Sequence, residues 1–117
     1  MIVKIKGSFE AAHFLPEYRG SCNHLHGHTY HYVFNFKGET EANGMVIDFK
    51  ILEQIVKTVI EKYDHQLLNE FIPNPTAENI AQSIFDIFKK YNALSDKINL
   101  KSLELWETDK YGVEVSD

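Results

Sequence analysis

Residues 2–13 read IVKIKGSFEAAH, and apolar and polar side chains alternate along them with the period of two that a β-strand requires. Phe9, Ala11 and His13 share one face of this predicted strand. Residues 26–38 read HGHTYHYVFNFKG, which is rich in aromatic and β-branched side chains and predicts a second strand. Proline, glycine and asparagine fill the connection, so we expect an antiparallel hairpin with a long loop.

Two helices are predicted after this hairpin. Residues 48–63 and 76–91 carry apolar side chains at helical spacing, and Asp48 is placed to cap the first helix. The intervening segment, residues 64–75, ends in two closely spaced prolines and is expected to be irregular.

Strand character returns over residues 98–107 and again, after a turn, over residues 113–115. The element order ββααββ predicts an α+β fold, with a four-stranded antiparallel sheet and two helices on one of its faces. Such a sheet has two open edges, so we expect subunits to pair through them.

The size and composition fit one globular domain over residues 1–117, with 44% hydrophobic and 25% charged side chains. No apolar run approaches the roughly 18 residues of a membrane span, and the N-terminus lacks the apolar region of a signal peptide, so a cytoplasmic location is expected. The net charge of −5 argues against nucleic-acid and membrane-surface partners. The single cysteine, Cys22, excludes an internal disulfide.

The segment His26-Gly27-His28 carries the strongest chemical signal. Side chains two apart on a strand share a face about 6.6 Å apart, so both imidazoles can reach one ion at Zn–N distances of about 2.0–2.1 Å. His13 ends the first strand where the hairpin brings it beside them. Three histidines leave one coordination position open, as in catalytic zinc sites. Chance clustering among six histidines is the alternative.

Three further features are candidates for chemistry near such an ion. Cys22 is either a thiolate base or nucleophile, or a buried small hydrophobic side chain. Asp64-His65 is either a proton-transfer pair or a helix C-terminal feature. Arg19 has the fork geometry of a phosphate contact, but it also fits a solvated loop charge.

Glu107 shares the parity of the apolar side chains on its predicted strand, so it is either a carboxylate that accepts two parallel N–H bonds from a ligand edge or a solvated residue beyond the strand end. The segment from Asn74 to Glu78 is interpreted first as a helix start, with Thr76 or Asn74 as its cap. His31 has the opposite strand parity from the His26–His28 pair and should point away from the ion. His24 lies in the loop and can face either way.

Six segments spread over nearly the whole chain share an order with one known family. They are Phe9-Glu10-Ala11-Ala12-His13, Cys22-x-x-x-His26-Gly27-His28, Val46-Ile47-Asp48-Phe49, Asp64-His65-x-x-Leu68-Asn69, Pro75-Thr76-Ala77-Glu78-Asn79 and Trp106-Glu107. With them the chain resembles the 6-pyruvoyltetrahydropterin synthase family. The three residues between Cys22 and His26 are most similar to its 6-carboxytetrahydropterin synthase branch, which belongs to the queuosine pathway.

This resemblance implies the tunnelling fold, in which subunits form a trimeric barrel and two trimers stack into a homohexamer with sites at subunit interfaces. It implies one Zn²⁺ held by His13, His26 and His28.

The resemblance also implies roles for the other candidates. Cys22 would be the catalytic base, and Asp64-His65 would be its relay and proton donor. Glu107 would anchor the amino-pyrimidinone edge of a pterin, with help from Thr76.

The implied reaction is that of a zinc-dependent lyase, which converts 7,8-dihydroneopterin triphosphate to 6-carboxy-5,6,7,8-tetrahydropterin, acetaldehyde and triphosphate. Two sister reactions are alternatives: formation of 6-pyruvoyltetrahydropterin and aldolase-type cleavage of the pterin side chain. A noncatalytic protein that only binds zinc or pterin is a further alternative.

Overall fold

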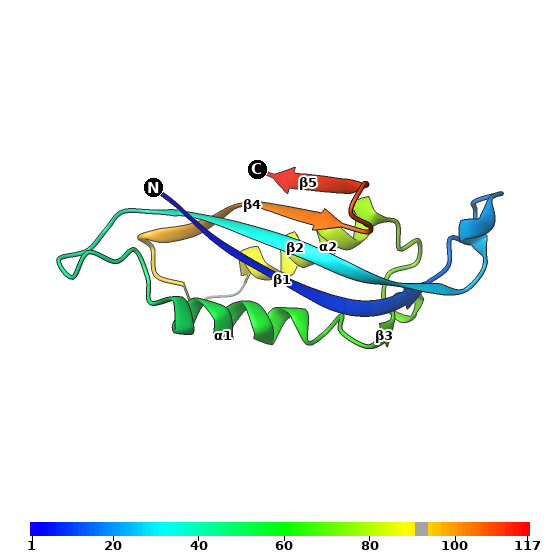
Figure 1. Cartoon of the computed structure of the whole chain (residues 1–117), viewed down its shortest axis with the longest axis horizontal. Helices are drawn as coiled ribbons and strands as arrows, with labels where there is room; N and C mark the ends of the chain where they lie inside the picture. Colours follow the sequence, from blue (N-terminus) through cyan, green and yellow to red (C-terminus); the bar gives the residue numbers. More distant parts are fainter. Residues whose placement is uncertain (91–93) are drawn as a thin grey trace.

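The computed structural model describes residues 1–90 and 94–117. Its longest feature is the predicted hairpin, in which β1 (Ile2–His13) and β2 (His26–Gly38) pair antiparallel along their whole length. His13 lies opposite His26, so the register brings the histidine ends of the two strands together. Figure 1 shows this hairpin running along the long axis of the molecule.

The sheet extends from the hairpin on both sides. β4 (Ile98–Trp106) pairs antiparallel with β2, and β5 (Gly112–Ser116) pairs antiparallel with β4. On the other side, the two-residue strand β3 (Gln66–Leu67) pairs in parallel with residues 11–12 of β1. The strand order is therefore β3-β1-β2-β4-β5.

The short strand β3 corrects the prediction of four antiparallel strands. It lies in residues 64–75, which we expected to be irregular, and it is followed by the 3₁₀ turn η2 (Leu68–Glu70). A strand of two residues shows no alternation that a sequence could reveal, and its pairing is set by tertiary contacts.

Both helices begin at capped residues. α1 (Phe49–Ile60) starts after Asp48, whose carboxylate accepts the N–H of Lys50 at 2.8 Å as predicted. α2 (Ala77–Lys90) starts after Thr76, whose hydroxyl oxygen accepts the N–H of Asn79 at 3.1 Å. Tyr91, the predicted last residue of this helix, lies outside the described residues.

The two helices cover one face of the sheet. Their apolar sides and the inward side chains of the strands form one buried cluster, which includes Phe9, Tyr30, Phe34, Leu103 and Leu105 from strands and Leu52, Val56, Ile80, Ile84 and Phe88 from helices. Each such side chain stabilises the fold by roughly 1.5–3 kcal/mol relative to an exposed one. The strand parity of a residue therefore decides whether it faces the helices or the open side of the sheet. Among the described residues, no helix has the length and apolarity needed to cross a membrane.

Candidate metal and active site

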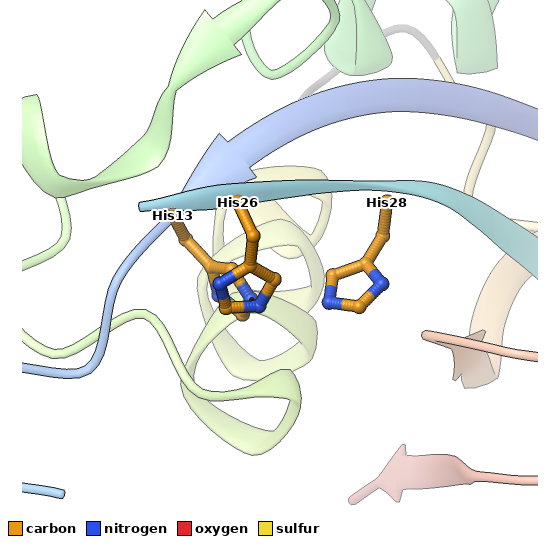
Figure 2. Close-up of side chains that lie close together, drawn as sticks. All are labelled: His13, His26 and His28. Carbon is orange, nitrogen blue, oxygen red and sulfur yellow. Dashed lines mark hydrogen bonds between the residues drawn. The ribbon is translucent and has the colours of Figure 1, made fainter. Parts of the chain in front are cut away.

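Three imidazoles meet at the end of the hairpin. His13 comes from the last position of β1, and His26 and His28 come from the start of β2 on the same face. One nitrogen from each ring lies within 4.8 Å of the other two. Figure 2 shows the three rings on one side of the strands, turned toward one another. The structure thus brings together the three residues that the spacing had selected.

Backbone carbonyls fix the tautomers of two of these rings. The Nδ1–H of His13 donates to the carbonyl of Pro75 at 2.7 Å, and the Nδ1–H of His26 donates to the carbonyl of His24 at 2.7 Å. In the neutral rings the Nε2 atoms then carry lone pairs, yet these two atoms lie 3.0 Å apart. Lone pairs that face each other at this distance repel unless a cation lies between them.

The third ring also carries an unused nitrogen. Nε2 of His28 is buried and has no hydrogen-bond partner. Burial lowers the pKa of His13 and of His28, and this effect outweighs the opposing influence of the nearby Glu107 charge. Both rings are therefore neutral near pH 7, which is the form that binds metals. Three imidazoles with one ring nitrogen each turned toward a common point fit Zn²⁺.

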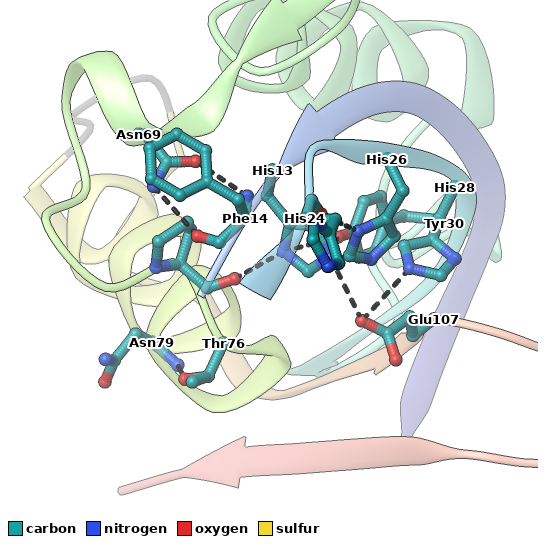
Figure 3. A network of polar contacts seen from close by, with 11 residues as sticks. His13, Phe14, His24, His26, His28, Tyr30, Asn69, Thr76, Asn79 and Glu107 are labelled. Atoms are coloured by element: carbon teal, nitrogen blue, oxygen red, sulfur yellow. Dashed lines mark hydrogen bonds and ion pairs between the residues drawn. The ribbon is translucent and has the colours of Figure 1, made fainter. Parts of the chain in front are cut away.

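Glu107 lies beside this cluster. β4 ends at Trp106, one residue earlier than predicted, but the Glu107 side chain still faces the histidines. Its Oε1 atom is 3.5 Å from Nε2 of His13 and 3.4 Å from Nε2 of His28. Figure 3 shows the carboxylate between these two rings. Its side chain remains 25% exposed, so it is accessible to a ligand.

Tyr30 forms the floor of the cluster. Its ring is fully buried, and its hydroxyl lies 3.3 Å from Nδ1 of His13. Burial raises the pKa of Tyr30, and negative charge on Glu107 and on Cys22 raises it further. The hydroxyl therefore stays protonated at physiological pH.

Cys22 lies in the loop between the two histidine-bearing strands, in the 3₁₀ turn η1 (Ser21–Asn23). Its backbone carbonyl accepts the N–H of Leu15 at 2.9 Å, a hydrogen bond between the two ends of the loop. The Cys22 side chain is half-buried. The loop that carries Cys22 joins the end of β1, where His13 lies, to the start of β2, where His26 lies.

Asp64 and His65 form a contact pair beside β1. The Asp64 carboxylate accepts the N–H of Glu10 at 3.0 Å and lies 3.0 Å from Nδ1 of His65. The Glu10 N–H lowers the pKa of the Asp64 carboxyl, and the His65 ring lowers it further. His65 has a φ of 59°, the one positive value among the described residues other than glycine. Its N–H donates to the carbonyl of Glu10, which holds this uncommon conformation in place.

The sheet separates this pair from the histidine cluster of the same chain. Glu10 and His13 have opposite parity on β1, so their side chains project from opposite faces. The Glu10 carboxylate accepts the hydroxyl of Thr29 at 3.1 Å and lies 3.9 Å from Nε2 of His65, which places all three side chains on the open face. The His65 ring is 74% exposed there.

A hollow of about 540 Å³ lies along this part of the sheet. Its lining residues are Glu10, Ala11, Ala12, Gly27, His28, Thr29, His65, Gln66 and Leu67. A Cβ at Gly27 would meet only the Ala11 carbonyl oxygen, at an ordinary contact distance of 3.5 Å. Packing within this chain therefore does not require the glycine, and the space beside it is open to an approaching group.

The remaining sequence candidates lie farther out. His31 is exposed and of opposite parity to His28, as predicted. The side chain of His24 is exposed. Its backbone carbonyl, rather than its ring, contacts the cluster by accepting the Nδ1–H of His26. Arg19 is exposed in the loop. The Thr76 hydroxyl is used as the predicted helix cap.

Sequence reasoning missed two groups that position the site. The Pro75 carbonyl orients His13, and Glu10 holds the Asp64-His65 pair. The role of the Pro75 carbonyl could not be predicted from the Pro75-Thr76 helix start alone, because it depends on α2 beginning beside the end of β1. Glu10 has the outward parity of a solvated strand residue, so it gave no signal.

Known proteins are similar to this chain in sequence and in fold. The sequence model of the family described as 6-pyruvoyl tetrahydropterin synthase matches residues 2–117. A Haemophilus influenzae protein named 6-carboxy-5,6,7,8-tetrahydropterin synthase is 35% identical over 128 residues, covering 86% of this chain and 88% of that protein. A Pyrococcus furiosus protein named dihydroneopterin monophosphate aldolase is 38% identical over 110 residues, covering 94% of this chain and 92% of that protein.

A solved structure agrees along the whole chain. The Caenorhabditis elegans 6-pyruvoyl tetrahydropterin synthase matches with a TM-score of 0.89 at 27% identity, covering 100% of this chain and 95% of that one. The histidine hairpin, the two helices on one face and these matches lead to one conclusion: the chain belongs to the 6-pyruvoyl tetrahydropterin synthase family and has its tunnelling fold.

Proposed function

We propose that this chain is a zinc-dependent lyase that converts 7,8-dihydroneopterin triphosphate and water to 6-carboxy-5,6,7,8-tetrahydropterin, acetaldehyde and triphosphate, a step of queuosine biosynthesis. The observation that carries the proposal is the convergence of three imidazoles, with one ring nitrogen of each within 4.8 Å of the other two. The name of the Haemophilus influenzae relative supports this choice of reaction.

The metal-holding part of the mechanism belongs to His13, His26 and His28. Zinc bound there supplies Lewis-acid polarisation of the hydroxyl oxygens on the substrate side chain. The carbonyls of Pro75 and His24 keep the Nδ1 protons of two rings engaged, so that the Nε2 lone pairs stay directed at the ion. Because His13 is only 1% exposed, its side of the site is closed to water.

Glu107 and Thr76 are proposed to bind the pterin ring. The Glu107 carboxylate can accept two parallel N–H bonds from the amino-pyrimidinone edge, a charge-assisted arrangement that fixes both distance and orientation. Its position beside His13 and His28 supports this role, because the ring and its side chain must reach the carboxylate and the metal together. Thr76 keeps its hydroxyl proton free for donation while the oxygen caps α2.

Proton transfer is assigned to Cys22 and to the Asp64-His65 pair. The Cys22 thiolate, near a cation, would remove a proton from the substrate side chain. Asp64 holds Nδ1 of His65, so Nε2 is the position that accepts or returns a proton. Since His65 lies across the sheet from the histidines of its own chain, we propose that it serves the site of a neighbouring subunit, in a homohexamer built from two trimers.

A turnover assay tests the proposal directly. The zinc-loaded protein is incubated with 7,8-dihydroneopterin triphosphate, and the products are separated and identified. We expect acetaldehyde, triphosphate and a carboxylated tetrahydropterin in equal amounts. A pyruvoyl product without acetaldehyde would replace our reaction with the sister synthase activity, and no turnover at all would leave only a binding protein.

An aldolase-type reaction is the second candidate, because the Pyrococcus furiosus relative bears that name. Cleavage of this kind leaves the phosphate on the released aldehyde, so it gives no free triphosphate. Detection of a phosphorylated aldehyde in the same assay would favour it.

Cys22→Ala gives the assay its internal control. We expect turnover to fall by at least roughly 100-fold, the size of a lost general base, while the zinc content per chain stays unchanged. Equal activity in the variant would show that another group is the base.

A further inference from the structure

The distances around Glu107 are those of a metal ligand rather than of a hydrogen-bonding neighbour. Two atoms that share a tetrahedral zinc at about 2.0–2.1 Å lie roughly 3.3–3.4 Å apart. Oε1 of Glu107 is 3.5 Å from Nε2 of His13 and 3.4 Å from Nε2 of His28, while a good N–H···O bond is about 2.9 Å long. The carboxylate oxygen therefore has the separation from two imidazoles that a fourth ligand would have.

The protonation states of the rings lead to the same conclusion. Nε2 of His28 is buried and makes no hydrogen bond, even though the carboxylate is 3.4 Å away. Nε2 of His13 bears a lone pair, because its Nδ1 proton is engaged by Pro75. A carboxylate that faces lone pairs in a half-buried site is destabilised unless a cation lies between them.

The backbone at Glu107 is held by hydrogen bonds of the turn between β4 and β5, whereas its side chain is 25% exposed. The N–H of Glu107 donates to the carbonyl of Tyr111 at 3.0 Å. The Thr108 hydroxyl oxygen accepts the N–H groups of Lys110 and Tyr111, each at 3.2 Å, which closes the turn between β4 and β5. Moving the carboxylate toward or away from the histidines therefore requires side-chain rotation alone.

We propose that Glu107 is the fourth metal ligand in the substrate-free protein and that it leaves the metal when substrate binds. A substrate hydroxyl takes its place, and the released carboxylate accepts the N–H groups of the pterin ring. The exchange rests on the proposed function, whereas ligation in the empty site does not. Glu107 then couples binding of the substrate hydroxyl at the metal to binding of the pterin ring, because its carboxylate can accept the ring N–H groups only after it has left the metal.

The experiment is made without substrate, on the full chain loaded with Co²⁺ or Zn²⁺. Zinc affinity is measured by competition with a chelating dye, and the visible absorption of the Co²⁺ protein reports its ligand set. Glu107→Gln and Glu107→Ala are expected to bind zinc at least roughly tenfold more weakly than the wild type and to have altered Co²⁺ spectra. Circular dichroism of each variant verifies that it folds.

Glu104→Gln is the matched control. Glu104 lies on the same strand, and its Oε1 accepts the indole N–H of Trp106 at 3.2 Å, a bond that the amide oxygen of glutamine preserves. This variant should keep the wild-type zinc affinity and Co²⁺ spectrum. Wild-type values in both Glu107 variants would overturn the inference, and if they also bound pterin weakly, Glu107 would be a ring anchor only. If the turnover assay fails but the Glu107 variants still bind zinc more weakly and have altered Co²⁺ spectra, the proposed reaction is wrong and Glu107 remains assigned as a ligand.

Discussion

At the scale of single residues, the proposed metal site depends on how three converging imidazoles are oriented. Two backbone carbonyls hold the Nδ1 protons of His13 and His26, and burial keeps His13 and His28 neutral. The third ring, His28, has an unused Nε2 and no carbonyl partner. Its contribution to metal binding is therefore the most direct to test.

Replacing His28 with alanine should remove zinc without unfolding the protein. We expect zinc affinity to fall by at least roughly 100-fold, because loss of a direct ligand should cost no less than loss of an outer partner. Zinc per chain, measured by elemental analysis after dialysis, should drop from one to near zero.

His31→Ala is the control for this variant. His31 lies on the same strand, is exposed and projects from the other face, so its loss should leave zinc at one per chain. Equal zinc loss in both variants would mean that any histidine-to-alanine change on β2 disturbs zinc binding, and that the His28 ring is not a specific ligand.

The Asp64 carboxylate predicts a pH-dependent stability. Its pKa is lowered in the folded protein, chiefly by the Glu10 N–H, so its contribution is present above its unfolded pKa and is lost as the pH falls through the folded value. Asp64→Asn should lower the free energy of unfolding by about 0.5–1 kcal/mol at neutral pH, a small effect because the carboxylate is partly solvated. Urea unfolding should show this deficit shrinking between about pH 5 and pH 3. If the difference in free energy of unfolding between Asp64→Asn and the wild type stays constant over that pH range, the loss of stability does not come from the carboxylate charge.

At the scale of elements, the start of α2 has two structural roles. Thr76 caps the helix, and the preceding residue, Pro75, presents its carbonyl to His13. A helix start that frays would therefore also loosen the metal site.

Thr76→Ala should destabilise the protein by about 1 kcal/mol, the usual cost of losing a helix cap. Thr76→Ser retains the hydroxyl and should stay within a few tenths of a kcal/mol of the wild type. Denaturant unfolding of the two variants measures the difference. If both lose the same stability, the threonine methyl group rather than the cap is responsible.

The long elements and the convergence of the three histidines could be predicted from the sequence because each rests on a periodic pattern. Strand parity and the register of the hairpin together place His13, His26 and His28 on one face. It did not reveal β3, whose two residues are paired by tertiary contacts. Nor did it reveal the link between Glu10 and Asp64, which are 54 positions apart and meet through a backbone N–H that every residue possesses.

At the scale of the whole molecule, the sheet divides the proposed catalytic groups into two sets. The metal cluster and Glu107 lie on the helix side, and His65 lies on the open side with Glu10 and Thr29. β3 and β5 form the sheet edges, and each is short and available for pairing with another chain. This division is the reason for our proposal that a second copy of the chain completes the site.

Mixing two inactive variants tests this completion. Cys22→Ala and His65→Ala should each be inactive alone, but co-expression should restore about a quarter of wild-type activity, because a site with Cys22 from one chain and His65 from the next forms at random in one case out of four. Turnover per chain in the purified mixture is the measurement. No recovery in mixed oligomers would show that His65 does not act across subunits.

The most direct test of the metal site is an X-ray diffraction experiment on crystals of the purified protein, with data collected on both sides of the zinc absorption edge. The expected result is a zinc-specific peak about 2.0–2.1 Å from Nε2 of His13, His26 and His28. A map from catalytically active crystals without a peak among these three nitrogens would contradict it.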